Sequence, residues 1–276
     1  MKGIKPPYNR TRIFVQESSG FLFMKPLGQK SYGSIPHLPG SRLGPGDHHC
    51  HEGQRVIATE KVRDKWDRVI IQEKLDGGNV GIAKLNGKIL AITRAGYLAE
   101  TSKYKTHHIF KRWVDDNHDR FMRVLNEGER LCGEWLFTAV GTKYKLPHEP
   151  FVAFDIIKGN DRLNYANFFD RVGELFVTPN LLNDDRPMSI EEAIVMLEAS
   201  NLHGALEQRE GVVWRVERKN KVDFLCKYVR PEKVDGKYLE VDIINEMPEC
   251  FDYLKEGFAQ LVMPDSTKEV ESKNKC

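Results

Sequence analysis

Cysteine is scarce in this chain of 276 residues, and its spacing excludes the cross-linked and zinc-binding classes. The five cysteines are odd in number, widely scattered and without a C-x-x-C pair: Cys50, Cys132, Cys226, Cys250 and Cys276. Long apolar runs are also missing, since none approaches the roughly 18 residues that cross a bilayer. The start, Met1–Pro7, lacks the apolar centre of a signal peptide. We therefore expect reduced thiols in a cytoplasmic protein with no membrane contact.

Net charge is almost absent as well. The 42 Lys and Arg residues nearly balance the 40 Asp and Glu residues, which leaves a formal net charge of +2. The chain therefore lacks the broad positive field of a protein that coats nucleic acid, and a local patch would have to meet any polyanionic partner. A hydrophobic fraction of 40% nevertheless supplies a buried core for one large domain or two modest ones.

Short apolar and alternating runs predict a β-rich core. Seven such runs are present: 69–72, 80–85, 88–93, 131–137, 151–157, 212–216 and 222–228. Helical spacing of apolar residues predicts a helix within 101–125 and another over 189–199, where Ser189 and Glu192 form a capping box. A last helix is expected over about 248–262. These elements together indicate an α+β fold.

The two ends of the sequence differ from this pattern. The first 50 residues contain many helix and strand breakers: Pro26, Gly28, Gly33, Pro36, Pro39, Gly40, Gly44, Pro45 and Gly46. We expect loops that run over the surface and line a site. Within them, Asp47–His51 could bind a transition metal, but its spacing fits no standard motif and a surface loop is favoured. The polar tail from Asp265 is expected to fray.

The most informative segment ends a β run with a lysine. Lys74 is followed at once by Asp76 and by two glycines, Gly77 and Gly78. Glycines let backbone amides approach a ligand closely, and consecutive N–H groups in a turn can form an anion nest. We therefore expect Lys74 at a strand end beside a turn that accepts a phosphate.

The next signal is the dipeptide Asn86-Gly87, which is typical of a two-residue hairpin. Without a bulge, the numbers of cross-strand partners sum to 173, and Arg94 then faces Asn79. This register predicts that Lys74, Asn79 and Arg94 line one pocket mouth. A cation there would favour the neutral amine, so we expect a lowered pKa of Lys74.

At this point the sequence resembles the covalent nucleotidyltransferases, which comprise the ATP-dependent DNA and RNA ligases and the mRNA capping guanylyltransferases. Their first motif, K-x-D-G, is similar to Lys74-Leu75-Asp76-Gly77. Five further motif positions follow in the family's order: Arg94, Glu134, Phe154, Glu210 and Lys227. The resemblance covers roughly residues 70 to 230. It implies an ATP-grasp-like ligase fold of antiparallel sheets flanked by helices.

Within that superfamily, the position of Asn79 resembles the RNA ligase 2 branch, because DNA ligases and capping enzymes more often carry arginine there. The branch usually has K-x-K in its last motif, whereas this chain has Leu225-Cys226-Lys227. The second phosphate contact is therefore missing, or Arg230 or Lys233 supplies it. About 40 residues follow, too few for an OB domain. The expected division is a catalytic domain over 1–235 and a short helical C-terminal piece over 236–276.

The resemblance implies an ATP-dependent RNA ligase of RNA repair that uses Mg²⁺ or Mn²⁺. Lys74 would attack the α-phosphate of ATP to give lysyl-AMP, and AMP would pass to the 5′-phosphate of an RNA that is then sealed to a 3′-hydroxyl. Three alternatives stay open: a DNA nick ligase, a GTP-dependent capping guanylyltransferase, and a nucleotide- or RNA-binding module that does not seal.

The same resemblance assigns roles to residues. Lys227 would hold the α-phosphate, Phe154 would stack on adenine, and Glu134 would accept a hydrogen bond from a ribose hydroxyl. The implied catalytic residues are Lys74, Lys227, Glu210 and Arg94. The implied nucleotide-binding residues are Glu73, Lys74, Asn79, Arg94, Glu134, Phe154, Glu210 and Lys227. The implied metal ligands are Asn79 and Glu210.

Two basic clusters are candidates for RNA phosphate contacts, with a solvated face as the plain alternative. One opens the helix predicted within 101–125 and consists of Lys103, Lys105, His107, His108, Lys111 and Arg112. The other is expected on a hairpin tip and consists of Arg215, Arg218, Lys219 and Lys221.

Overall fold

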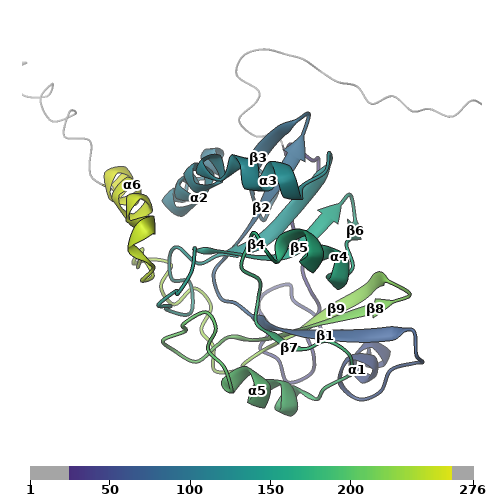
Figure 1. Cartoon of the computed structure of the whole chain (residues 1–276). Helices are drawn as coiled ribbons and strands as arrows, with labels where there is room; N and C mark the ends of the chain where they lie inside the picture. The colour runs from purple at the N-terminus through teal and green to yellow at the C-terminus, as the bar shows by residue number, and fades with distance from the viewer. Residues whose placement is uncertain (1–24, 263–276) are drawn as a thin grey trace, which may run out of the picture.

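Two antiparallel sheets form the centre of the computed structural model, which describes residues 25–262 (Figure 1). Sheet A has the order β7-β1-β8-β9 and sheet B the order β3-β2-β4-β5-β6. The strands are β1 (Asp67–Lys74), β2 (Gly78–Leu85), β3 (Lys88–Thr93), β4 (Glu129–Trp135), β5 (Phe151–Lys158), β6 (Asp161–Arg162), β7 (Leu181–Asn183), β8 (Gly211–Arg218) and β9 (Lys221–Val229). The α+β prediction and its seven strands are confirmed.

The β2–β3 hairpin has the predicted register. Asn86 and Gly87 form the turn with φ values of 51° and 71°, the left-handed conformation that a two-residue turn of this type requires. Val80 pairs with Thr93, so the partner numbers sum to 173 and no bulge intervenes. This register carries Asn79 and Arg94 to the same end of the hairpin.

Helices cover the outer faces of both sheets (Figure 1). They are α1 (Glu52–Thr59), α2 (Lys105–Asp116), α3 (His118–Val124), α4 (Tyr165–Val172), α5 (Ile190–Glu198) and α6 (Asp252–Val262), with 3₁₀ turns η2 (Ala99–Thr101) and η3 (Glu249–Phe251). The capping box of Ser189 and Glu192 at α5 is confirmed. The single helix expected within 101–125 is divided at Asn117, whose φ of −110° and ψ of 17° lie outside the helical range.

Each sheet buries its own core. Sheet B packs with α2, α3, α4 and α6 around an aromatic cluster that includes Trp113, Trp135 and Phe151, all fully buried. Sheet A packs with α1 and α5 around a smaller hydrophobic cluster that includes Ile71 and Trp214. Truncating a large buried ring of this kind costs about 3–5 kcal/mol. Both sheets are therefore fixed frames for the residues that project between them.

The N-terminal segment is more deeply packed than its composition predicts. The expectation of a surface loop is wrong for Ser31, His37 and Leu38, which are almost fully buried. Leu38 belongs to the core of sheet A, and its N–H donates to the carbonyl of Lys227 at 2.8 Å. Glycines and prolines prevent regular helices and strands in this segment, but its backbone groups still find hydrogen-bond partners at the edge of β9.

The C-terminal helix is confirmed as α6, and its Leu254 and Phe258 join the core of sheet B. The polar tail from Asp265, together with Cys276, lies outside the described residues, and the proposed boundary at 235 stays a prediction. Within 25–262, no helix combines the length and apolar character that crossing a membrane requires. Four cysteines in this range, Cys50, Cys132, Cys226 and Cys250, are free thiols, as predicted.

Candidate active site

A cavity of about 410 Å³ opens between the two sheets. Residues from both sheets and from the N-terminal segment line it. All eight residues that the motifs singled out are among them: Glu73, Lys74, Asn79, Arg94, Glu134, Phe154, Glu210 and Lys227. Positions spread over some 150 residues of sequence thus converge on one cavity.

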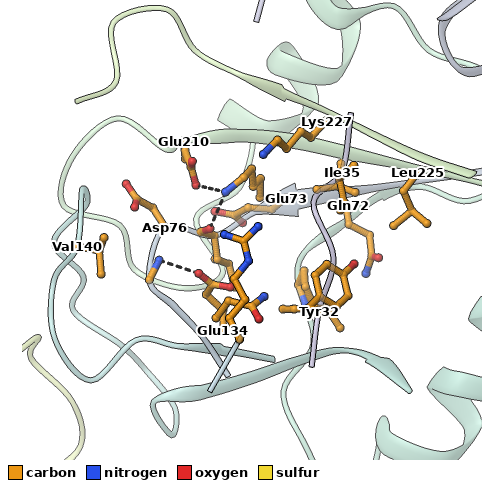
Figure 2. Close-up of a pocket in the computed structure, with 18 of the residues that line it drawn as sticks. Tyr32, Ile35, Gln72, Glu73, Asp76, Glu134, Val140, Glu210, Leu225 and Lys227 are labelled. Atoms are coloured by element: carbon orange, nitrogen blue, oxygen red, sulfur yellow. Dashed lines mark hydrogen bonds and ion pairs between the residues drawn. The ribbon is translucent and has the colours of Figure 1, made fainter. Parts of the chain in front are cut away.

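Lys74 ends β1 inside this cavity and forms an ion pair with Glu210. The Nζ of Lys74 lies 2.5 Å from the Oε2 of Glu210, and the two side chains are 22% and 10% exposed. Because Lys74 pairs with Gly211 across β1 and β8, the strand register itself places the carboxylate beside the amine. Figure 2 shows Glu210, Asp76 and Glu134 on one side of the cavity, with Tyr32 and Leu225 at the other end.

The protonation of Lys74 differs from the prediction. Burial works against the ammonium charge, but the attraction of Glu210, Glu134 and Asp76 outweighs it, so the pKa of Lys74 is raised. The expected lowering is therefore wrong for this ligand-free structure. Three carboxylates surround the amine, whereas the prediction took into account only the positive charge of Arg94. Burial also raises the pKa of Glu210, against the attraction of Lys74.

The turn after Lys74 is held by side chains. Asp76 accepts hydrogen bonds from the Gly141 N–H at 3.1 Å and the Thr142 hydroxyl at 2.9 Å. The Gly77 N–H donates to the Oε1 of Glu134 at 3.1 Å. A Cβ at Gly77 would lie 2.8 Å from the carbonyl oxygen of Trp135, so glycine is required by space. In this structure a carboxyl oxygen of Glu134 accepts from the Gly77 amide, and the phosphate contact expected of this turn stays a prediction.

Asn79 and Glu134 face each other across β2 and β4. The Oδ1 of Asn79 and the Oε2 of Glu73 are buried without a hydrogen-bond partner, and burial raises the pKa of Glu73 and of Glu134 to about 7. Buried oxygens without partners are unfavourable unless a ligand satisfies them. Mg²⁺ prefers oxygen ligands and is commonly held by one or two carboxylates and substrate phosphates. The unpartnered Oδ1 of Asn79 suits such an ion, whereas Glu210 is paired with Lys74 and its role as a metal ligand stays a prediction.

Aromatic side chains form the opposite end of the cavity. The rings of Phe154 and Tyr32 meet edge to face with centroids 5.0 Å apart, and Ile35 and Leu225 complete an apolar wall. Sequence analysis predicted Phe154 and missed Tyr32 and Gln72, whose side chain is buried beside the cavity with its Nε2 unpaired. The only available signal for Tyr32 was its position in the loop-rich N-terminal segment.

Lys227 lies on β9 and faces the cavity. Its N–H donates to the carbonyl of Pro36 at 2.9 Å, and its own carbonyl accepts from Leu38, so the N-terminal segment holds its backbone. Burial and repulsion by Lys74 lower the pKa of Lys227, while Asp47 and Glu210 oppose this. Figure 2 places its side chain near Glu210.

Neither expected substitute for the missing second lysine lines this cavity. Lys233 is buried and donates to the Thr142 hydroxyl at 2.6 Å and the Gln208 carbonyl at 3.0 Å. Arg230 pairs with Glu198. Both cations are committed to structural contacts, so that interpretation is wrong, and apolar Leu225 occupies the position where the branch carries lysine.

The basic clusters differ from each other. In the second cluster, Lys219 and Lys221 are exposed at the β8–β9 hairpin, but Arg215 is only 2% exposed and lies 3.3 Å from Asp155. Arg218 pairs with Asp64 and Asp67. The prediction of four RNA-facing cations on a tip is therefore wrong for Arg215, because the sheet alternation turns it inward.

The first cluster follows η2 and covers the start of α2. Lys103, Lys105 and Arg112 are exposed, while His107 is bonded to Ser102 at 2.6 Å and burial lowers its pKa to about 4. In the loop over 47–51, Asp47 lies beside His37. No group of three or more His, Cys, Asp or Glu residues within 25–262 could hold a metal ion, so the metal alternative for this loop gains no support.

Comparison with known proteins decides the family. The sequence model of the RNA ligase family matches residues 67–229, a range that contains all the motif residues and both sheets. The chain belongs to the RNA ligase family. Its membership agrees with the resemblance to the covalent nucleotidyltransferases.

This RNA ligase family member is also similar to individual proteins. An uncharacterised protein of Methanocaldococcus jannaschii is 26% identical over 136 residues, which are 49% of this chain and 29% of that protein. An archaeal ATP-dependent RNA ligase has 18% identity and a TM-score of 0.44, with 87% of this chain and 60% of that one covered. A Naegleria gruberi RNA ligase variant with ATP and Mn has 21% identity and a TM-score of 0.42, with 64% and 52% covered. The chain thus spans less than two thirds of each of these relatives.

Proposed function

We propose that this chain is an ATP-dependent RNA ligase that acts through lysyl-AMP at Lys74. One observation carries the proposal: a half-buried lysine ends β1 in a cavity between two sheets, where the motif residues of a nucleotidyltransferase surround it. Phosphate oxygen is a poor leaving group, and a covalent intermediate divides a difficult displacement into easier ones.

In the first step, the neutral amine of Lys74 attacks the α-phosphorus of ATP. A P–N bond forms, the bond between the α-phosphorus and its bridging oxygen breaks, and pyrophosphate leaves. The proton on Lys74 must move first, and the Oε2 of Glu210 at 2.5 Å is the acceptor within reach. Lys227 and Arg94 offer positive charge to the phosphates, because developing negative charge needs preorganised cations.

Nucleotide binding uses the aromatic end of the cavity. Phe154 offers a ring face to adenine, with Tyr32 packed against it in an edge-to-face contact, and Glu134 accepts from a ribose hydroxyl. Asn79 and Glu210 would hold Mg²⁺ or Mn²⁺, which would neutralise phosphate charge. AMP then passes to the 5′-phosphate of RNA, and the 3′-hydroxyl displaces it to complete the phosphodiester. We assign residues 1–235 to this adenylyltransferase unit and 236–276 to a C-terminal helical piece.

The test is a labelling experiment with two nucleotides. The protein is incubated with Mg²⁺ and ATP or GTP labelled at the α-phosphate, and covalent label is read on a denaturing gel. We expect label from ATP on Lys74 and sealing of a 5′-phosphorylated RNA to an RNA 3′-hydroxyl. Label from GTP alone would indicate a capping guanylyltransferase, preference for DNA strands a DNA ligase, and absence of any label a binding module.

A further inference from the structure

One buried lysine lies close to the turn over 75–77. Lys233 comes shortly after β9, and its side chain is only 9% exposed. Its ammonium donates to the Thr142 hydroxyl at 2.6 Å, the Gln208 carbonyl at 3.0 Å and the Gly141 carbonyl at 3.2 Å. All three donors of the ammonium are therefore used. A buried charge is still unfavourable unless an opposite charge compensates it.

The opposite charge is Asp76, the acidic residue of the K-x-D-G motif. Its Oδ2 lies 3.4 Å from the Nζ of Lys233. The Thr142 hydroxyl connects the two groups, because it accepts from Lys233 and donates to the same Oδ2 at 2.9 Å. The Gly141 N–H donates to the Oδ1 at 3.1 Å, and a Cβ at Gly141 would collide with the carboxylate. Lys233 therefore completes a closely fitted set of contacts around Asp76.

Asp76 in turn fixes the backbone next to the proposed nucleophile. Its side chain lines the cavity (Figure 2), and its own N–H donates to the Tyr144 hydroxyl at 3.1 Å. Because Asp76 is the second residue after Lys74, a shift of its backbone would move the end of β1 and the amine with it. The contacts thus connect Lys233 to Lys74 through Asp76.

The segment that carries Lys233 is itself anchored. The Tyr238 N–H donates to the Val140 carbonyl at 2.9 Å, and the Tyr238 hydroxyl donates to Glu207 at 2.6 Å. These contacts hold the segment against the loop whose hydroxyl and amide bind the carboxylate. The match to the RNA ligase family ends at residue 229, so the motifs of the family give Lys233 no role.

We propose that Lys233 is a positioning residue, which holds Asp76 by charge and hydrogen bonding and thereby fixes the turn that presents Lys74 to the nucleotide. The proposal rests on the proposed function, in which Lys74 attacks ATP. A small misplacement of a reacting group can lower a rate by about a hundredfold. The lysine that was expected to contact a phosphate thus acts on the nucleophile instead.

The first test measures the turn and needs no activity. Full-length Lys233→Met, which removes the charge and keeps the length of the side chain, is compared with Lys237→Met. This control changes a lysine of the same segment that is 47% exposed and pairs with Glu207, and an exposed ion pair contributes little. Hydrogen exchange is followed by mass spectrometry on peptides that contain residues 75–78 and 141–142.

Lys233→Met should speed exchange in these peptides several-fold and leave the β2–β3 hairpin unchanged, because the loss is local. The control should match the wild type. Thr142→Val, which removes only the hydroxyl between Lys233 and Asp76, should show the same local change and replaces Lys233→Met if that variant does not fold. Faster exchange throughout the protein, or unchanged exchange at the turn, would overturn the proposal.

The second test is the rate of lysyl-AMP formation against ATP concentration. Lys233→Met should lower the rate at saturating ATP by about tenfold to a hundredfold, with less than about a threefold change in the half-saturating ATP concentration, because the nucleotide contacts remain. Lys233→Arg, which keeps the positive charge, should recover part of the rate. Lys237→Met should match the wild type.

A folded Lys233→Met protein with the wild-type rate would overturn the proposal, as would a larger change in the half-saturating ATP concentration than in the rate. A wild-type protein that takes no label would instead overturn the proposed function. Exchange at the turn would then still decide whether Lys233 holds Asp76.

Discussion

The two lysines of the cavity lie in opposite electrostatic surroundings. Lys74 is surrounded by carboxylates from Glu210, Glu134 and Asp76, which raise its pKa. Burial and the repulsion of Lys74 lower the pKa of Lys227, against the attraction of Asp47 and Glu210. Carboxylates thus favour the ammonium form of one lysine, whereas burial and a neighbouring cation oppose the charge of the other.

This difference indicates how charge is divided before a nucleotide binds. A bound triphosphate would bring negative charge, which would neutralise the cations Lys227 and Arg94. The carboxylates around Lys74 already give that lysine an excess of negative charge. A divalent cation at Asn79 and Glu210 would reverse the balance around Lys74 and favour its neutral amine. The ligand-free structure thus favours protonated Lys74, and under the proposed function a bound metal ion would supply the charge that releases the proton.

The largest expected effect is at Lys74 itself. Lys74→Arg keeps the positive charge but lacks a readily deprotonated amine, so lysyl-AMP formation should fall by more than about a thousandfold. Thermal unfolding should be nearly unchanged. Lys61→Arg, at an exposed position, is the control, and mapping of an AMP adduct to any lysine other than Lys74 would contradict the prediction.

The second-largest effect is expected for Glu210→Gln, which should change both lysyl-AMP formation and the pKa of Lys74. Loss of the proton acceptor and metal ligand should slow lysyl-AMP formation by about a hundredfold. Because the carboxylate raises the pKa of Lys74, its removal lowers that pKa, and acetylation of Lys74 without nucleotide should begin at lower pH than in the wild type. Acetylation that is slower in the variant would show that Glu210 does not hold the ammonium form.

The mouth of the cavity should be less sensitive. Asn79→Ala and Arg94→Ala should each lower nucleotidyl transfer by about tenfold to a hundredfold, and neither should change the free energy of unfolding by more than about 1 kcal/mol. Gly77→Ala is the contrast, because its new Cβ would meet the Trp135 carbonyl and destabilise the fold. A large loss of stability in Asn79→Ala would mean that this side chain serves packing.

The smallest effects concern the β8–β9 hairpin. Burial opposes the charge of Asp67, but Arg63 and Arg218 outweigh it and lower its pKa to about 2. The stabilisation from this carboxylate is present above its unfolded pKa of about 4 and is lost as pH falls toward 2. Arg218→Ala should therefore lower the unfolding temperature at pH 7 more than at pH 2, whereas Lys219→Ala with Lys221→Ala should not.

Lys219 and Lys221 of the β8–β9 hairpin test whether this hairpin contacts RNA. If both contact phosphates, the double variant should reduce the salt dependence of RNA binding by about two counterions and leave lysyl-AMP formation intact. Neutralising Lys103, Lys105, Lys111 and Arg112 tests the first cluster in the same way. Full sealing by both variants would place the RNA path elsewhere, and equal loss of charging and sealing would mean that the cluster supports the fold.

The sequence predicted the parts of this structure that follow from local rules. The Asn86-Gly87 turn fixed the β2–β3 register, and the alternating runs located seven strands. Five of the motif residues, Arg94, Glu134, Phe154, Glu210 and Lys227, were found because the sequence resembles the covalent nucleotidyltransferases. Lys74, Asn79 and Arg94 therefore line one cavity, as the register argument required.

The parts that were missed depend on contacts between distant segments. The raised pKa of Lys74 follows from three carboxylates that β4, β8 and the turn bring together, which no local pattern reveals. Arg215 was misplaced because it sits in a basic run, although strand alternation points it at Asp155. Tyr32 and the buried His37 were missed because a segment rich in glycine and proline gives no periodic signal, even where it packs tightly.

The N-terminal segment over 34–47 limits how far the chain can be shortened. β9 is the outer strand of sheet A, and between Lys227 and Val229 its edge is covered by hydrogen bonds to the Leu38, Pro36 and Arg42 backbones. The residues that match the RNA ligase family begin at 67, so a fragment cut to that match would lose this cover and the buried side chain of Leu38. An uncovered strand edge pairs readily with another chain. We expect such a fragment to aggregate. A stable fragment should therefore begin before residue 34.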